Sequence, residues 1–516
     1  MRRVLLFFAL VIGTLLLLVS LREGDKGLFN GWQVASITIF ATFIYGTLLY
    51  GEFRLGFAFG GMSLLLALDL ISVTQFVESA HLNVIMFLVG MFIVIGYLEE
   101  NQFFERIVAG IVAAVGPRPQ MLLLALMLMA TVSAALVDEV TSILFMMGTM
   151  LHLTGKYKLN PVPFVLMLVF ATNIGSAASS IGNPIGVMIA MGAGLSFADF
   201  LRWSAPVAVV VSVATYYICR WWFADAFRAF AAAVHEEHRA VVAQSAALPL
   251  TAASSPVVPG DVDKDGVYSG PAEGMLESTH VQNGAKSSCW LPWVIFGVTI
   301  VLLVTHGWTE RLLGLHEGTM MLGVALLMGG IVLLICREKA RSLVEKRVDW
   351  WTLSFFMMLF ASVGTLQHMG VTKVIAQQLI NATGDNQNLL IWVVGWATGW
   401  LSAFLDNVLA VATFMPIVAD VRAAAAPNPY PEAIYWAMLF GGTFMGNMTV
   451  IGSTANIIAL GVLEKRGHGT VKFLYWFKIG FIVSVASMLV AMALLWTQNR
   501  YISNPMLSPP VTSGPR

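Results

Sequence analysis

Long apolar runs, separated by short polar segments, dominate the pattern of the chain. A helix needs about 20 apolar residues to cross the hydrocarbon of a bilayer. Runs of this kind predict membrane spans at 4–21, 32–50, 55–73, 82–98, 203–223, 291–308, 320–336, 351–366 and 473–496. Two shorter amphipathic stretches, 103–115 and 371–380, are expected to lie at the membrane interface.

Four further apolar runs contain polar residues near their middle. The runs 120–153 and 389–418 are interrupted at Asp138-Glu139 and at Asp406-Asn407. We interpret both as re-entrant hairpins. The runs 161–195 and 433–463 are interrupted by segments rich in Gly, Ser, Thr and Asn, and we interpret them as broken helices. The pattern therefore predicts an all-α polytopic membrane protein with about 11 transmembrane helices.

The hairpin and the broken helix occur twice, in the same order. Asp406 follows Asp138 by 268 residues, and Asn447 follows Asn173 by 274. Basic clusters at 337–347 and 465–478 place those segments, and with them the N-terminus, in the cytoplasm. The two halves then start on opposite sides of the membrane, so they are predicted to be inverted repeats. The expected divisions are an N-terminal transmembrane anchor (1–31), a first repeat (32–223), a disordered cytoplasmic loop (224–289), a second repeat (290–499) and a C-terminal tail (500–516).

Composition supports a membrane protein and excludes several other classes. Hydrophobic residues make up 58% of the 516 residues and charged residues 11%, whereas soluble domains carry about 25% charged residues. The lipid bilayer is therefore the expected environment, in the cell (inner or plasma) membrane. The formal net charge is zero, which gives no attraction for nucleic acid. The three cysteines form no CxxC pair and suggest no zinc site.

The interrupted segments carry the candidate site. A charged side chain at the bilayer centre costs about 2.5–3.5 kcal/mol on insertion scales, so such acids are expected to have a partner, an ion or a proton. The candidate ion- or substrate-binding residues are Asp138, Glu139, Asn173, Gly175, Ser176, Ser179, Asn183, Asp406, Asn407, Asn447, Thr449, Gly452, Ser453, Thr454 and Asn456. Sodium is expected at the amide oxygens of Asn173, Asn183, Asn447 and Asn456. Two structural alternatives stay open: the aspartates cap helices, and the small residues serve close helix packing.

Paired, interrupted apolar segments in two halves are a pointer to a transporter site near the midplane. None of the segments 120–153, 172–184, 389–418 and 446–456 contains Lys or Arg, whereas they hold three carboxylates. This favours cation–proton exchange, or exchange of a neutral solute for protons, over transport of an organic anion. An intramembrane aspartyl protease that uses Asp138 and Asp406, and a passive channel, are the alternatives from other classes. No cofactor is expected beyond a coupling Na⁺ or H⁺.

Three stretches resemble a known family. The segments 402–416 (SAFLDNVLAVATFMP), 446–468 (GNMTVIGSTANIIALGVLEKRGH) and 173–184 are similar to the ion transporter superfamily with a citrate-transporter-like domain. The similarity is greatest to its arsenite-efflux and sodium/proton antiporter branch, which includes the melanosomal P protein. The resemblance implies inverted repeats, a homodimer, and elevator-type alternating access by a transport part that moves against a scaffold.

The resemblance also implies two half-sites. Asp406-Asn407 with 447–456 would form one, and Asp138 with 173–183 the other. The first hairpin has Asp138-Glu139 where the branch often has Asp-Asn, and neither tip has the Ser-Asn-Thr signature of the sodium–dicarboxylate branch. We therefore expect a secondary active transporter, with cation/proton antiport or arsenite-type efflux favoured and sodium- or proton-coupled di- or tricarboxylate symport as the alternative.

Overall fold

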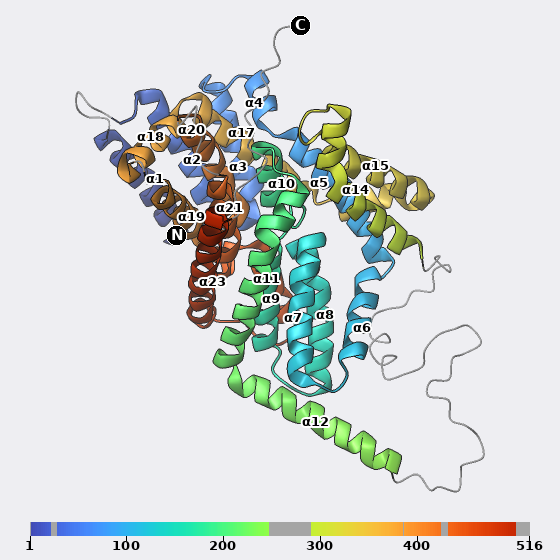
Figure 1. Ribbon diagram of the computed structural model, residues 1–516. Helices are drawn as coiled ribbons and strands as arrows, with labels where there is room; N and C mark the ends of the chain where they lie inside the picture. The colour runs from blue at the N-terminus through green and yellow to red at the C-terminus, as the bar shows by residue number, and fades with distance from the viewer. Residues whose placement is uncertain (1, 22–27, 247–289, 385, 425–431, 502–516) are drawn as a thin grey trace.

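The computed structural model describes residues 2–21, 28–246, 290–384, 386–424 and 432–501, and every regular element in them is a helix (Figure 1). Nine of these helices are long and apolar enough to cross a membrane, or up to ten if the bent pair α17–α18 counts as one span. The prediction of an all-α polytopic membrane protein is confirmed. The eleven expected crossings counted each broken helix as one span and neither hairpin, so that number stays a prediction.

The expected span at 55–73 is wrong. Its helix, α3 (Arg54–Ala67), has 14 residues, or about 21 Å at 1.5 Å per residue, against about 30 Å of hydrocarbon. Asp69 takes a left-handed conformation, with φ 55, which ends the helix. The chain then turns into the short helix α4 (Val73–Ser79).

The order of helices repeats in the two halves. The N-terminal part is α1 (Arg2–Ser20), α2 (Gly31–Leu49), α3 and α4. The first half continues with α5 (Leu82–Glu100), α6 (Phe103–Val115), α7 (Pro119–Leu136), α8 (Glu139–Lys156), α9 (Val162–Gly175), α10 (Pro184–Ala193) and α11 (Phe197–Trp222). The second half has α14 (Leu291–Leu313), α15 (Thr319–Cys336), α16 (Ala340–Arg347), α17 (Trp350–His368), α18 (Val371–Thr383), α19 (Gln387–Phe404), α20 (Asn407–Ala424), α21 (Ala433–Phe444), α22 (Thr454–Lys465) and α23 (Phe473–Tyr501). Thus α6 to α11 and α18 to α23 each consist of a single helix, a hairpin, a broken pair and a long helix.

The predicted interruptions are helix boundaries in the structure. The α7–α8 and α19–α20 hairpins turn at Val137-Asp138 and at Leu405-Asp406. Asn183 caps α10 through a bond from the Gly186 amide (2.7 Å), and Ser453 caps α22 through the Ala455 amide (3.2 Å). Side chains of these types accept bonds from the otherwise unpaired amides of a first helical turn. The polar residues therefore start new helices within the apolar segments.

Part of the expected loop 224–289 is helical. Helix α12 spans Ala224–Ala246, and Phe227, Phe230 and Val234 on one of its faces are buried. The helix forms because alanine-rich sequence favours helix and because this apolar stripe packs on the ends of α8 and α9. The expectation of a disordered loop is therefore wrong for 224–246, and 247–289 lie outside the described residues.

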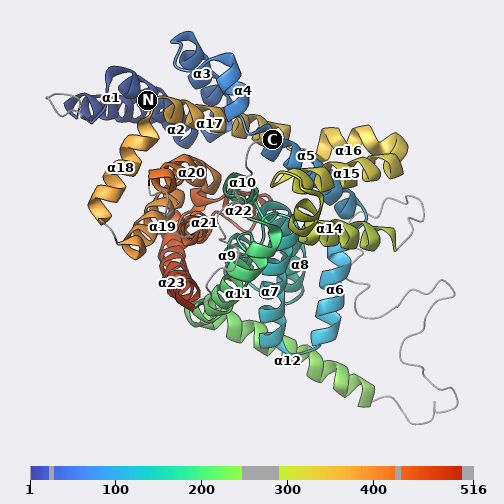
Figure 2. The same ribbon diagram turned by 45° about the horizontal axis from the view of Figure 1, so that its top comes forward.

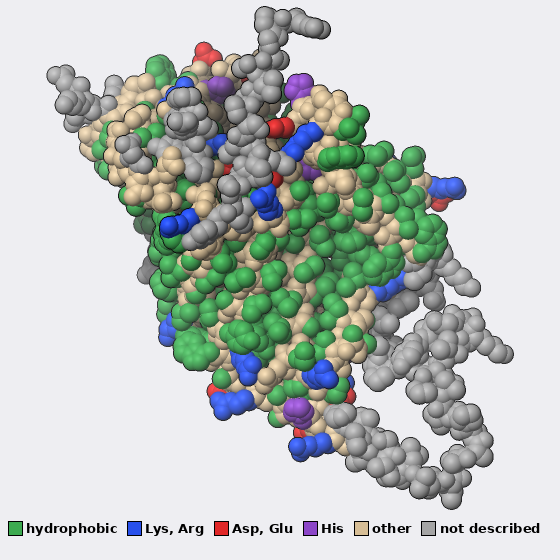
Figure 3. Space-filling view, viewed as in Figure 1, with side chains coloured by type: hydrophobic (Ala, Val, Ile, Leu, Met, Phe, Trp, Pro, Cys, Tyr) green, Lys and Arg blue, Asp and Glu red, His purple; other side chains and the backbone are tan. Residues whose placement is uncertain are grey.

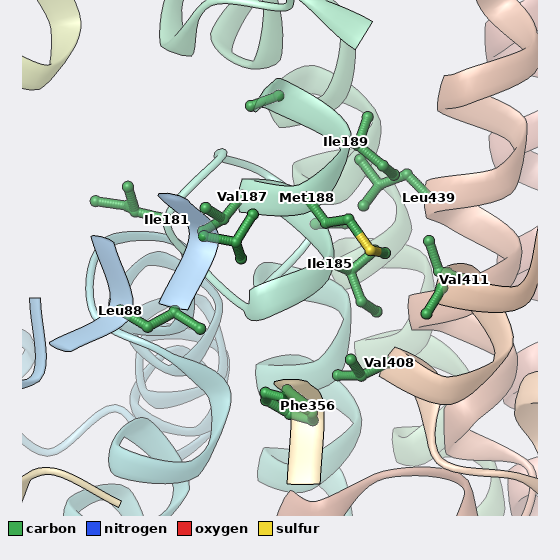
Figure 4. Packing of buried hydrophobic residues seen from close by; sticks show 14 of the residues in the cluster. Leu88, Ile181, Ile185, Val187, Met188, Ile189, Phe356, Val408, Val411 and Leu439 are labelled. Atoms are coloured by element: carbon green, nitrogen blue, oxygen red, sulfur yellow. The ribbon is translucent and has the colours of Figure 1, made fainter. Parts of the chain in front are cut away.

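The two sets of repeated helices lie side by side, with α1 to α5 and α14 to α17 along one side of them (Figure 2). Close helix crossings depend on glycine: a Cβ on Gly90 of α5 would lie 2.5 Å from the Ala325 carbonyl oxygen of α15. Helix α10 is buried between α5, α17, α20 and α21, as the side chains in Figure 4 show. On the face in Figure 3, hydrophobic side chains form a broad band, as expected for contact with lipid.

Candidate functional site

The carboxylate of Glu139 lies where the two halves of the chain meet. Glu139, at the tip of the first hairpin, is 5% exposed. Its Oε1 accepts hydrogen bonds from Asn407 Nδ2 (3.0 Å) and Ser453 Oγ (3.0 Å), and its Oε2 accepts one from Ser176 Oγ (3.0 Å). One acid thus contacts both hairpin tips and both broken helices. These donors are neutral, so Glu139 is held by an amide and two hydroxyls rather than by an ion pair.

Asparagine side chains join the two broken helices directly. Asn173 Nδ2 donates to Asn447 Oδ1 (2.7 Å) and to Asn456 Oδ1 (2.8 Å). Asn173 Oδ1 lies 3.0 Å from Ser453 Oγ, whose single proton is shared with Glu139 Oε1. Asn456 Nδ2 in turn donates to the carbonyl oxygens of Gly446 and Thr449. All of these groups are buried. Residues about 270 positions apart in the sequence therefore form one hydrogen-bonded layer.

Each broken helix also forms a hydrogen bond with the hairpin of its own half. Ser179 Oγ donates to the Ala135 carbonyl oxygen, and Thr449 Oγ1 donates to the Ala403 carbonyl oxygen. The two acceptors are 268 residues apart, like the two aspartates. The glycines that follow the donors let each broken segment fold back on itself, since a Cβ on Gly182 or Gly452 would lie 2.5 Å from the carbonyl oxygen of Ser176 or Gly446. The two halves are therefore built by the same local contacts.

The aspartates at the two tips both cap helices. Asp138 Oδ1 accepts from the amides of Val140 (2.7 Å) and Thr141 (2.9 Å). Asp406 Oδ1 accepts from the Val408 amide (3.0 Å). The helix-capping role that the sequence left open is therefore performed by one carboxylate oxygen of each aspartate. The second oxygen of Asp406 accepts a bond from Thr454 Oγ1, and the second oxygen of Asp138 takes no part in the cap.

A cavity of about 220 Å³ lies beside the hairpin tips. Helices α5 and α17 form one wall, and the tips of the hairpins with the starts of α10 and α22 form the other. Its charged lining residues are Glu99, Asp138, Glu139, Arg347 and Asp349. Arg347 Nη1 pairs with Glu99 Oε2 at 2.9 Å. Carboxylates therefore outnumber cationic groups in the wall, and the one guanidinium already has a carboxylate partner.

A larger hollow of about 840 Å³ lies between α2 and α3. Phe, Leu, Ile and Gly dominate its lining, with three hydroxyl-bearing residues, Thr42, Tyr50 and Ser63, and no acid. Its chemistry suits lipid or protein rather than an ion, so the smaller cavity is the candidate site.

The structure brings most of the expected site residues together. The cavity wall includes Asp138, Glu139, Asn183, Asn407 and Thr454. Directly behind it, in the hydrogen-bonded layer, lie Asn173, Ser176, Asn447, Thr449, Gly452, Ser453 and Asn456. Ser179 and Gly175 serve packing instead, because Ser179 bonds to the first hairpin and a Cβ on Gly175 would lie 2.2 Å from the Thr131 carbonyl oxygen.

The four amides proposed for sodium already have hydrogen-bond partners. The Oδ1 atoms of Asn173, Asn183, Asn447 and Asn456 each accept one hydrogen bond. A carbonyl oxygen has a second lone pair, so a sodium ion at these amides stays a prediction.

Several residues of the cavity wall were not among the candidates expected from the sequence. Glu99, Thr141, Arg347 and Asp349 line it, but only Thr141 belongs to an interrupted segment. Arg347 was part of the basic cluster that served to orient the chain. The arginine reaches the cavity because its side chain packs over Gly96, where a Cβ would lie 2.7 Å from Arg347 Cβ. No pattern along the chain signals that packing.

Comparison with known proteins agrees with this architecture. The family model described as "Citrate transporter" matches residues 53–441 and 366–506. An uncharacterized transporter of Mycobacterium tuberculosis is 27% identical over 414 residues, which is 80% of this chain and 86% of that protein. The 46 kDa membrane protein of Mycobacterium leprae has the same identity and the same coverage.

The P protein of Sus scrofa is 26% identical over 508 residues, which is 89% of this chain and 59% of that longer protein. The resemblance noted in the sequence is therefore confirmed. Relatives that are named transporters argue against a protease that uses Asp138 and Asp406. The chain belongs to the citrate transporter family and is a multi-pass membrane transporter.

Proposed function

We propose that the protein is a secondary active transporter that exchanges a monovalent cation for protons across the cell membrane. The observation that carries the proposal is the lining of the cavity, where four carboxylates face one guanidinium and Glu139 is held by neutral groups alone. A carboxylate in such a site is stabilised either by a bound cation or by a proton, so the two compete. Competition at one group is the chemical requirement for antiport.

The arrangement of helices suits alternating access. The cavity separates α5 and α17 from the hairpin tips, so movement of the tips relative to that wall would expose Glu139 to either side. Arg347 belongs to the basic cluster 337–347, which favours the cytoplasm. We therefore propose that this cavity faces the cytoplasm and that the N-terminus is cytoplasmic. Arsenite-type efflux would use the same movement with a neutral solute.

A carboxylate symporter is the second candidate, and one observation favours it. The Arg347 guanidinium lines the cavity, and guanidinium groups bind carboxylates through paired hydrogen bonds. The description of the matching family also names citrate. For this function Arg347 would have to release its ion pair with Glu99 and bind a carboxylate of the substrate instead.

Proteoliposomes that contain a pH-sensitive dye test the proposal. We expect external sodium or lithium to discharge an imposed pH gradient with saturation, and Glu139→Gln to reduce the rate at least tenfold. The amide of the substituted side chain still offers an oxygen to Asn407 and Ser453, so the fold is expected to persist. Glu78→Gln, at an exposed position, is the matched control. Potassium, arsenite and labelled citrate are tested in the same vesicles.

Two outcomes would contradict antiport, and a third would contradict the role of Glu139. Accumulation of citrate under a sodium gradient, with no discharge by any cation, would establish the symporter. Conduction without saturation or proton coupling would indicate a channel. Undiminished exchange by the Glu139→Gln variant would remove Glu139 from the mechanism.

A further inference from the structure

The aspartates of the two hairpin tips differ in the hydrogen bonding of their second carboxylate oxygen. Asp406 Oδ2 accepts a bond from Thr454 Oγ1 at 2.9 Å, so both of its carboxylate oxygens are occupied. Asp138 uses Oδ1 to cap α8, whereas its Oδ2 is buried and has no hydrogen-bond partner in the described part of the chain. Equivalent aspartates therefore have unequal capacity for a ligand.

The first residue of the neighbouring half-helix differs between the two repeats. Thr454 follows the cap residue Ser453 in the second half, and Pro184 follows the cap residue Asn183 in the first. Proline is well suited to the first position of a helix, because its missing amide hydrogen would have no helical partner there. Proline has no hydroxyl, however, so this position offers no donor to Asp138 Oδ2.

The two aspartates also differ in their position relative to the 220 Å³ cavity. Asp138 lines the 220 Å³ cavity, together with Glu139, Thr141 and Asn183, whereas Asp406 is absent from its lining. Burial of an unpaired carboxylate oxygen is unfavourable, and a cation bound there removes that cost. Carboxylate, hydroxyl and amide oxygens are the ligands that a hard cation prefers.

We propose that Asp138, together with Glu139, binds the transported monovalent cation of the sodium or lithium class, and that Asp406 is a positioning residue that holds α20 against α22. The assignment rests on the proposed antiport function. It places the cation at the first hairpin tip, whose Asp138 and Glu139 were already candidate ion-binding residues, rather than at the four asparagines expected to hold sodium. It also makes the two repeats functionally unequal.

Thermal unfolding of the purified full-length protein in detergent tests this without transport. A ligand that binds only the folded state raises the melting temperature as its concentration increases. We expect sodium or lithium chloride, compared with choline chloride, to raise the Tm of the wild type and not that of Asp138→Asn. Asparagine is also a good helix cap, so this variant is expected to fold.

Two further variants separate binding from structure. Asp406→Asn should lower the Tm in choline chloride, yet keep the cation-dependent rise with a half-saturating concentration within twofold of wild type. Pro184→Thr should provide a hydroxyl to Asp138 Oδ2 and raise the half-saturating concentration at least tenfold. Loss of the rise in Asp406→Asn with retention in Asp138→Asn would overturn the assignment, as would a wild type that no monovalent cation stabilises.

The same variants in proteoliposomes distinguish this inference from the function on which it rests. A wild type that binds sodium or lithium through Asp138 but exchanges no protons would refute antiport and leave the binding site standing. A wild type that exchanges protons, with undiminished exchange in Asp138→Asn, would refute the binding site and leave antiport standing.

Discussion

At the scale of single residues, the site is held together by amides. Asn173 alone donates two hydrogen bonds to residues of the second half, Asn447 and Asn456, and its Oδ1 lies 3.0 Å from Ser453 Oγ. Because these groups are buried, loss of one partner leaves the others unsatisfied. Such a residue is needed for the folded state whether or not it touches a transported ion.

Asn173→Ala is therefore expected to lower stability by about 2–4 kcal/mol, since each group left without a partner costs about 1–3 kcal/mol. The Tm in detergent is the measurement. Asn388→Ala, at an exposed position of α19, is the control and should change stability by less than about 0.5 kcal/mol. An unchanged Tm for Asn173→Ala would show that the amide layer contributes little to folding.

At the scale of helices, close crossings depend on residues without side chains. Gly90 of α5 and Gly329 of α15 lie against each other's backbones, and a Cβ on Gly90 would collide with Ala325. Gly110, in α6, has open space around it. The same residue type therefore has opposite roles in two helices.

We expect Gly90→Ala to destabilise the protein by about 1–3 kcal/mol, because an added methyl group in a packed crossing forces the helices apart. Gly110→Ala should instead be neutral or stabilising by up to about 1 kcal/mol, since alanine favours helix. Thermal unfolding of both variants provides the comparison. Equal effects in the two variants would mean that helix propensity, and not the crossing, determines the result.

Helix α12 is anchored to the end of α8 by a polar contact. Glu237 pairs with Lys156 Nζ at 2.6 Å and accepts a bond from the Tyr157 hydroxyl at 2.7 Å. These two groups hold the pKa of the Glu237 carboxyl below its ordinary value of 4.5. A depressed pKa means that the contact stabilises the fold above pH 4.5 and is lost as the pH falls through the lowered pKa.

Glu237→Gln should increase deuterium uptake in 224–246 at pH 7 by a modest factor, because a half-exposed ion pair contributes about 0.2–1 kcal/mol. The difference from wild type should disappear when both are compared at a pH well below the ordinary carboxyl pKa of 4.5. Glu236→Gln, on the exposed side of α12, is the control. A difference that persists in acid would show that the charge of Glu237 is not responsible.

At the scale of the whole molecule, the two hairpins enter from opposite ends. In Figure 1, α7 and α8 lie in the lower half near α12, whereas α20 lies in the upper half. Their tips meet through Glu139 and Asn407. This is the arrangement expected of inverted repeats, although their orientation in a membrane stays a prediction.

Labelling from one side of the membrane tests that orientation. In a variant without the native cysteines, Gly155→Cys at the end of α8 should react with an impermeant maleimide only from the cytoplasm. Ala423→Cys at the end of α20 should react only from the opposite side, because equivalent positions of inverted repeats face opposite compartments. Both positions are exposed. Reaction of both cysteines from the same side would exclude inverted repeats.

The sequence by itself determined the class of the protein and the location of its helix breaks. Apolar runs long enough to span a bilayer, and polar residues that cap helices inside them, act through their near neighbours along the chain, so their effect can be predicted from local pattern. Asp138, Asn183 and Ser453 were found in this way. The short α3 was misjudged because its hydropathy does not reveal the turn at Asp69.

Only the tertiary structure decided how these parts combine. Glu139 bonds to Asn407, and Arg347 reaches the cavity over Gly96. Thr454 donates to Asp406 Oδ2, whereas Asp138 Oδ2 has no hydrogen-bond partner in the described residues. All of these features depend on contacts between residues far apart in sequence. In the sequence, the two repeats have the same order of hairpin and broken helix, with an aspartate at each hairpin tip. Their difference appears only when each side chain is placed opposite its neighbour, because a hydrogen bond depends on distance and direction in space.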